Sequence, residues 1–80
     1  MDKIGEVTHY FTGIEVSVIE LKGKLKEGDT IALKGSSTDF EQKVDSMEID
    51  RAKVKEAGPG QSIGMKMAKR VRPGDEVFKV

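Results

Sequence analysis

Hydrophobic and polar residues alternate in short stretches along most of the chain. Residues 14–18 and residues 63–67 show this alternation most clearly, with apolar side chains at every second position. A period of two places the apolar set on one face of an extended strand. The pattern therefore predicts an all-β protein built from short strands.

Three glycine-containing segments interrupt the strands, at residues 23–29, 57–64 and 72–76. Glycine permits positive φ, and an aspartate after it can close a turn with its own side chain. Each segment is followed by an apolar strand, which favours a small barrel. The last apolar residues, Val77, Phe78 and Val80, predict a C-terminal strand that is tied into the sheet.

One strand contains a conflict of phase. Ile19 and Leu21 fall on the opposite face from Val16 and Val18 if the strand is regular. We therefore predict a β-bulge near Val18 and Ile19. Met65 and Met67, two residues apart, are expected to fill the core.

Composition limits the chemistry that is available. The chain has 80 residues, which fits a single domain over residues 1–80, and it has no cysteine and one histidine, His9. A disulfide framework is thereby excluded, and we expect neither a metal site nor a cofactor. Because the N-terminal residues lack a basic region followed by an apolar run, and no apolar stretch approaches the length of a bilayer span, we expect a cytoplasmic protein without membrane contact.

Four short motifs occur in order along the chain. They are Gly23-x-Leu25-x-x-Gly28-Asp29, Val44-x-Ser46-Met47-Glu48-Ile49, Glu56-Ala57-x-x-Gly60-x-x-Ile63-Gly64-Met65 and Gly74-Asp75. Together they resemble domain two of translational GTPases, the β-barrel of elongation factor Tu, the selenocysteine-specific factor and bacterial initiation factor two. The resemblance implies a closed antiparallel Greek-key barrel of about six strands.

Enzymatic chemistry is poorly represented. The phosphate loop Gly-x-x-x-x-Gly-Lys-Ser/Thr is absent, so the chain is not expected to bind GTP. His9 is the only imidazole, and beside Thr8 and Tyr10 on a strand it is better explained as a surface or rim residue than as a catalytic base. The carboxylates of Glu48 and Asp50 are better explained as solvated charges than as an acid–base pair. We therefore predict that the chain is not an enzyme.

The resemblance also implies an RNA contact. In elongation factor Tu the second barrel helps to hold the aminoacylated end of transfer RNA, and the corresponding positions fall on Glu48, Asp50, Arg51 and Ser62. Asp50 and Ser62 stand where the family shows a histidine and an asparagine. An arginine beside a carboxylate suits an RNA 3′ end. The alternative is a surface ion pair between Glu48 and Arg51.

A second candidate site is the densest run of positive charge. Lys66, Lys69, Arg70 and Arg72 lie within seven residues without an intervening acid, although the whole chain has 14 basic and 14 acidic residues. Such a run could follow the phosphates of structured RNA. The alternative is a solvated hairpin loop.

These observations predict a non-catalytic module that contacts transfer RNA or ribosomal RNA. The same barrel also resembles an accessory domain of collagenase-like peptidases of the U32 type. The alternative prediction is therefore a protein-interaction or accessory barrel with a protein partner and no RNA role.

Overall fold

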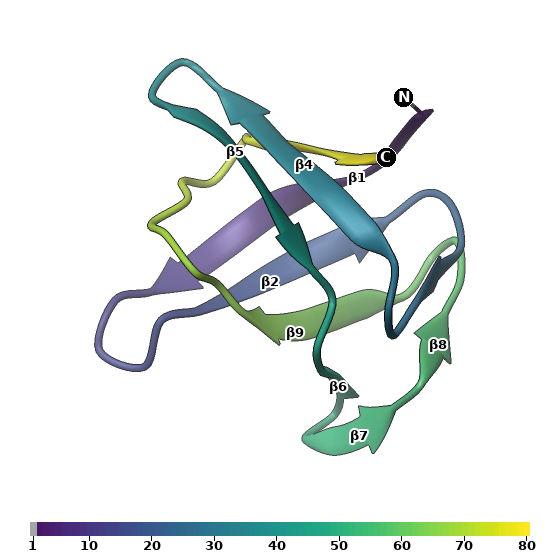
Figure 1. Ribbon diagram of the computed structural model, residues 1–80. Helices are drawn as coiled ribbons and strands as arrows, with labels where there is room; N and C mark the ends of the chain where they lie inside the picture. Colours follow the sequence, from purple (N-terminus) through teal and green to yellow (C-terminus); the bar gives the residue numbers. More distant parts are fainter. Residues whose placement is uncertain (1) are drawn as a thin grey trace.

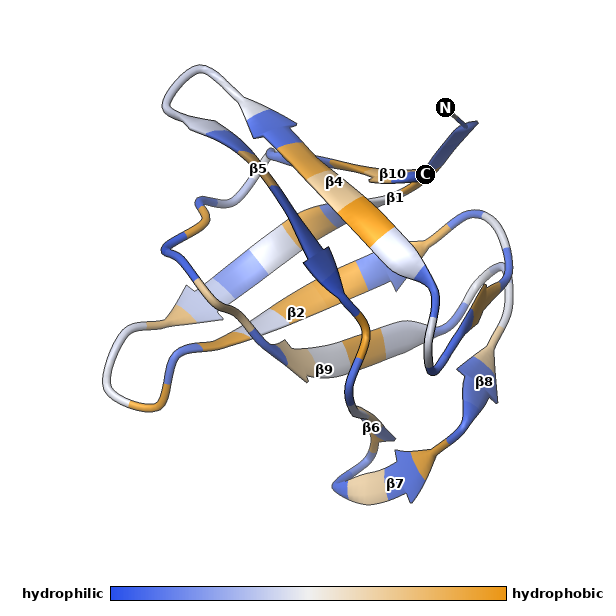
Figure 2. Cartoon of the chain, in the orientation of Figure 1, coloured by the Kyte–Doolittle hydropathy of each residue, from blue (hydrophilic) through white to orange (hydrophobic). Residues whose placement is uncertain are grey.

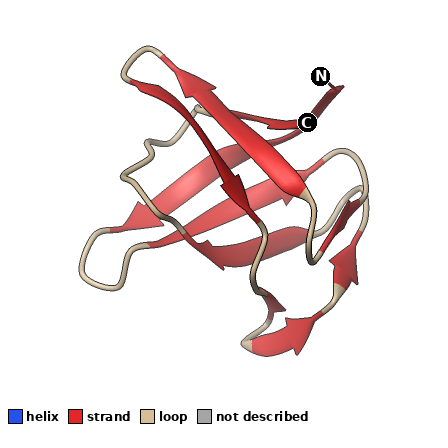
Figure 3. Ribbon diagram, in the orientation of Figure 1, coloured by secondary structure: helices blue, strands red, loops and turns tan. Residues whose placement is uncertain are grey.

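The computed structural model describes residues 2–80 and consists of strands joined by turns and loops (Figure 3). The strands are β1 (Asp2–Phe11), β2 (Val16–Leu21), β3 (Leu25–Lys26), β4 (Thr30–Gly35), β5 (Thr38–Lys43), β6 (Met47–Ile49), β7 (Ala52–Val54), β8 (Glu56–Ala57), β9 (Ser62–Lys66) and β10 (Glu76–Lys79). The all-β prediction is confirmed. Nothing in this described part of the chain forms a helix capable of crossing a membrane.

Eight of the strands form one curled antiparallel sheet in the order β5-β4-β10-β1-β2-β9-β6-β7 (Figure 1). The two remaining strands, β3 and β8, pair with each other. The C-terminal strand β10 lies between β4 and β1, so the last strand of the chain joins the two halves of the sheet. This confirms the prediction that the C-terminal strand is tied into the sheet.

The predicted closed barrel of six strands is wrong. Within residues 2–80, the sheet ends at β5 on one side and at β7 on the other, and no backbone ladder joins β5 to β9. The chain leaves the sheet after Lys43 and re-enters it at Met47, so β5 pairs only with β4. The Gln42 side chain spans part of this opening: its Nε2 donates to the carbonyl of Lys66 at 3.1 Å, and its Oε1 accepts from the amide of Ala68 at 2.8 Å.

The three glycine-containing segments form turns of one design. The turns are formed by residues 26–29, 58–61 and 72–75. In each turn the third residue is a glycine with φ between 87° and 96°, and the amide of the fourth residue donates to the carbonyl of the first. This is the type II geometry, which requires a positive φ at its third position. The fourth residue, Asp29, Gln61 or Asp75, also accepts a hydrogen bond from the first residue's amide at 2.7–2.9 Å. The predicted role of the glycines and aspartates is confirmed.

Asp29 should make the fold sensitive to acid. The hydrogen bond from the Lys26 amide, assisted by Lys79, lowers the pKa of its carboxyl below the usual value. A lowered pKa in the folded state stabilises the protein above the unfolded pKa, near 3.9, and this stabilisation disappears as the pH falls through the folded pKa. We expect urea unfolding to show Asp29→Asn less stable than wild type at pH 6, with the difference shrinking as the pH is lowered below about 4. A difference that stays constant over this range would contradict this.

The core lies in the concave side of the curled sheet. Figure 2 shows hydrophobic segments on β2, β4 and β9, the strands that surround it. Met65 and Met67 are each 2% exposed, so their predicted role as core fillers is confirmed. Ile19 and Leu21 face the same core from β2.

A β-bulge is present where the phase conflict predicts an irregularity, but the extra residue lies on the partner strand. Val7 pairs with Ile19 and His9 pairs with Val18, which leaves Thr8 of β1 unpaired in the ladder. The Thr8 hydroxyl donates to the carbonyl of Val18 at 3.2 Å. β2 therefore keeps a single phase, and its two valines do not face the core.

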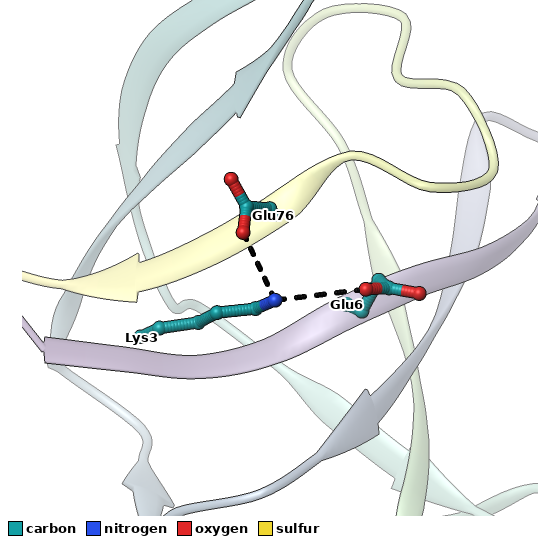
Figure 4. Close-up of polar contacts among 3 residues, drawn as sticks. All are labelled: Lys3, Glu6 and Glu76. Carbon is teal, nitrogen blue, oxygen red and sulfur yellow. Dashed lines mark ion pairs between the residues drawn. The ribbon is translucent and has the colours of Figure 1, made fainter.

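The neighbouring strands β1 and β10 carry a small network of charges near the chain ends. Lys3 of β1 lies 2.9 Å from Glu76 of β10 and 3.6 Å from Glu6 (Figure 4). The hydrogen bond to Glu76 is the main cause that raises the pKa of Lys3. Because these side chains are solvated, the pairs fix the register of β1 and β10 more than they add stability.

Candidate functional site

A hollow of about 490 Å³ lies on the convex, outer side of the sheet. Its lining comes from the end of the β1–β2 hairpin, from β2 and β9, and from the β6–β7 hairpin, and β2, β9 and β6 are successive neighbours in the sheet (Figure 1). The lining residues are Phe11, Ile14, Val16, Val18, Glu48, Asp50, Arg51, Ser62, Ile63 and Gly64. We call this feature the outer hollow.

The floor of the outer hollow is apolar because β2 points two valines outward. Ser17 and Ile19 are fully buried on the core side, so Val16 and Val18 occupy the outer side of the same strand and are half-buried. The Ser17 hydroxyl donates to the carbonyl of Met65 at 3.3 Å, which satisfies this polar group inside the core. On β2, therefore, two apolar side chains face the outer side of the sheet, while a serine faces the core.

The rim at the hairpin tip is also apolar and unusually exposed. Phe11 is 51% exposed and Ile14 is 64% exposed, two of the three large hydrophobic side chains exposed to this degree in residues 2–80. The Phe11 ring stacks on His9 with the centroids 6.4 Å apart. Exposed apolar groups that adjoin an apolar floor are typical of a surface that contacts another molecule.

The opposite rim is charged and is formed by the β6–β7 turn. Asp50 and Arg51 occupy this turn with φ of 51° and 66°. Two consecutive residues with positive φ characterise the tight hairpin turn that matches the twist of its strands, usually made by asparagine and glycine. An arginine in this conformation is uncommon, and such outliers occur often at functional sites.

The charges on this rim are not neutralised by each other. Glu48, Asp50 and Arg51 make no ion pair with one another or with any other residue in the described range 2–80, where the ion pairs involve the Lys3, Lys34 and Lys79 side chains. The predicted surface ion pair between Glu48 and Arg51 is therefore not formed. Two carboxylates and one guanidinium are left facing the outer hollow and solvent.

The four residues that the resemblance places at one contact come together. Glu48 pairs across the sheet with Gly64, and Ser62 lies two residues before that glycine on β9. Both line the outer hollow with Asp50 and Arg51. The apolar floor and rim were not predicted as part of a site. The signal for them was the phase conflict in β2, which could be resolved only by knowing which strand holds the bulge.

The basic run does not belong to the outer hollow and is not a hairpin loop. Lys66 ends β9, and the segment that follows crosses to β10, which is not a neighbour of β9 in the sheet. Met67 and Val71 are buried and anchor this crossing segment, while Lys69, Arg70 and Arg72 are exposed. The Lys69 ammonium lies 5.8 Å from the centre of the Phe40 ring.

Groups for metal binding or catalysis are sparse. Among residues 2–80, histidine and carboxylate side chains do not gather in groups of three or more that could hold a metal ion. His9 is exposed, and its Nδ1 lies 3.3 Å from the hydroxyl of its neighbour Thr8. This pair has no third group that orients it, as nucleophilic catalysis requires.

The fold and the site define a small all-β domain with an apolar and charged hollow on its outer face. The chain is 39% identical over 77 residues to an uncharacterised protease of Methanocaldococcus jannaschii and 31% identical over 78 residues to a collagenase of Porphyromonas gingivalis. These matches cover 95% of this chain but 19% and 22% of the relatives. The chain thus spans about a fifth of the length of the curated relatives it matches. No family model matches the chain.

Solved structures agree in fold. The C-terminal domain of a protein assigned as a U32 peptidase from Geobacillus thermoleovorans superposes with a TM-score of 0.94, covering 99% of this chain and 100% of that domain at 17% identity. A second structure of the same domain gives a TM-score of 0.93. The resemblance to domain two of translational GTPases is therefore wrong as an assignment of kinship, since the similarity leads to peptidases. The alternative, an accessory barrel like that of U32 peptidases, is the prediction that these comparisons support.

Proposed function

We propose that this chain is a non-catalytic accessory domain of a U32-type peptidase and that it holds polypeptide. The observation that carries the proposal is the match of almost the whole chain to about a fifth of a protease and of collagenases. This segment is short, and its described residues contain no group of three side chains that could hold a metal ion and no third group that orients His9 and Thr8. Such a segment is suited to positioning a substrate or a partner for a larger catalytic body.

The character of the site favours polypeptide over RNA. The outer hollow has an apolar floor and two unpaired carboxylates, which repel phosphate, beside a single arginine. The basic residues expected to track phosphates, Lys69, Arg70 and Arg72, lie on the crossing segment and do not line it. An RNA contact through those cations and Lys66 stays an untested prediction.

Binding of the isolated chain to gelatin and to transfer RNA separates these functions. We expect retention on immobilised gelatin in 300 mM salt and no cleavage of labelled gelatin. Apolar contacts depend weakly on salt, whereas phosphate contacts lose affinity steeply. A variant with Lys69, Arg70 and Arg72 replaced by glutamine should bind gelatin normally.

The opposite results would overturn the proposal. Salt-sensitive binding of transfer RNA that the triple glutamine variant loses, together with no retention on gelatin, would support the RNA function instead. Cleavage of labelled gelatin by the isolated chain would show that the domain is itself catalytic.

A further inference from the structure

Gly64 occupies the centre of the outer hollow without a structural requirement for glycine. It lies within β9, between Val18 of β2 and Glu48 of β6, which are its partners in the ladders. Its φ is outside the positive range found at Gly28, Gly60 and Gly74. A Cβ built on Gly64 would meet only one atom within 4 Å, the Cγ1 of Val16 at 3.8 Å, which is an ordinary contact.

The contrast with Gly5 shows what a structural glycine looks like in this sheet. A Cβ on Gly5 would lie 2.7 Å from the carbonyl oxygen of Glu20, so the fold excludes any larger residue there. Glycine inside a strand costs stability, and it is found where another molecule or backbone approaches closely. Gly64 has no such neighbour within the chain, and the space above it is the outer hollow.

We infer that the outer hollow is a binding site for an extended polypeptide segment that places a large apolar side chain over Gly64 and a lysine or arginine beside Glu48 and Asp50. This deepens the proposed function and rests on it. The apolar side chain would pack on Val16 and Val18 and against Phe11 and Ile14, whose side chains are exposed to solvent.

The charges on the rim set the chemistry of the neighbouring residue. Glu48 and Asp50 line the outer hollow without an ion-pair partner within residues 2–80. Glu20 of β2 is exposed next to the hollow and pairs across the sheet with Ser62. These three carboxylates favour a cation on the bound segment. The Arg51 guanidinium carries five donors, which suit the carbonyl oxygens of an extended backbone.

Titration of the ¹⁵N-labelled chain with blocked hexapeptides tests the inference directly. The probes are Gly-Gly-Lys-Phe-Gly-Gly and its counterparts with Glu-Phe or Lys-Ala at the centre. We expect the Lys-Phe peptide to shift amides in residues 14–18, 48–51 and 62–64, the Glu-Phe peptide to bind several-fold more weakly, and the Lys-Ala peptide to bind at least about tenfold more weakly.

Filling the hollow should change binding and stability in opposite directions. Gly64→Val should raise the melting temperature, since it puts a β-branched residue in a strand, and should weaken binding of the Lys-Phe peptide and of gelatin about tenfold or more. Gly58→Val is the matched control, because a Cβ there meets only the Gln61 Oε1 at 4.0 Å and Gly58 does not line the outer hollow. Glu48→Gln with Asp50→Asn should abolish the preference for Lys-Phe over Glu-Phe.

The outcomes separate this inference from the proposed function. If the wild type binds gelatin and Gly64→Val binds it equally well, the inference is overturned while the accessory function stands. If neither gelatin nor any hexapeptide binds at millimolar concentration, both are overturned. Shifts confined to other surfaces, or displacement of the peptide by transfer RNA at the same amides, would also overturn the inference.

Discussion

Deletion of Phe78, Lys79 and Val80 is expected to leave the chain unfolded at 25 °C. These residues pair with β1 on one side and with β4 on the other, and the Val80 amide donates to the Thr30 carbonyl at 3.0 Å. Without them, only Glu76 and Val77 still join β4 to β1, so each of the two ladders made by β10 keeps half of its residue pairs. A domain of this length has a total stability of about 4–12 kcal/mol, and we expect the loss of half of a central strand to exceed it. Far-UV circular dichroism and amide dispersion in an NMR spectrum measure the result.

Removal of Val80 alone is the control for this deletion. Its side chain is 59% exposed, and one backbone hydrogen bond joins it to β4. We expect cooperative melting with a small loss of stability. Cooperative melting of the three-residue deletion would show that the second half of β10 is dispensable and would contradict this prediction.

Asp75→Ala is expected to destabilise the domain by about 2–4 kcal/mol. Asp75 is 5% exposed, and its Oδ2 accepts hydrogen bonds from the Thr38 hydroxyl and from the Arg72 amide, at 2.9 Å for the amide. Alanine would leave both donors without their partner in a buried place. For a domain of this size such a loss lowers the melting temperature by about 10–25 °C, which calorimetry can measure.

Gly35 provides an internal check on the role of Asp75. A Cβ on Gly35 would lie 2.0 Å from the Oδ1 of Asp75, so Gly35→Ala should be strongly destabilising in the wild type. The same change should cost much less when Asp75 is already alanine, because the clashing oxygen is gone. Additive effects of the two substitutions would show that they do not share this contact.

The turns could be predicted from the sequence because their chemistry is local. Each needs a glycine at one position and a hydrogen-bond acceptor directly after it, and Gly28, Gly60 and Gly74 with their neighbours supply both. The same local motifs also misled the assignment of kinship. Turn residues indicate the fold, and proteins with unrelated functions can share one fold.

The remaining features depend on contacts between distant residues. The phase conflict in β2 is visible in the sequence, but Thr8, which absorbs it, lies on the partner strand. The β6–β7 hairpin gives no clear signal in the sequence, because Asp50 and Arg51 lack the asparagine–glycine signature of such turns. Closure of the sheet was predicted wrongly. Alternation along a strand shows which face is apolar, but it does not show whether the two edge strands of the sheet, here β5 and β7, reach each other.

In the candidate site, Glu48, Arg51 and Ser62 lie together as the resemblance implies, but their contact with RNA stays an untested prediction. The apolar half of the site could not be found, because Val16 and Val18 read as core residues until the buried Ser17 fixes the face of β2.

The two ends of the described chain lie next to each other, since Asp2 pairs with Lys79 (Figure 1). Phe11, on the rim of the outer hollow, is at the far end of β1, about 30 Å away along a ten-residue strand. If the domain is attached to a catalytic body through either end, both attachment points lie at the same end of β1. A bound segment would then lie at the opposite end of this strand. The length of β1 and the length of the linker would then set the distance between the bound segment and the bonds that a catalytic body could reach.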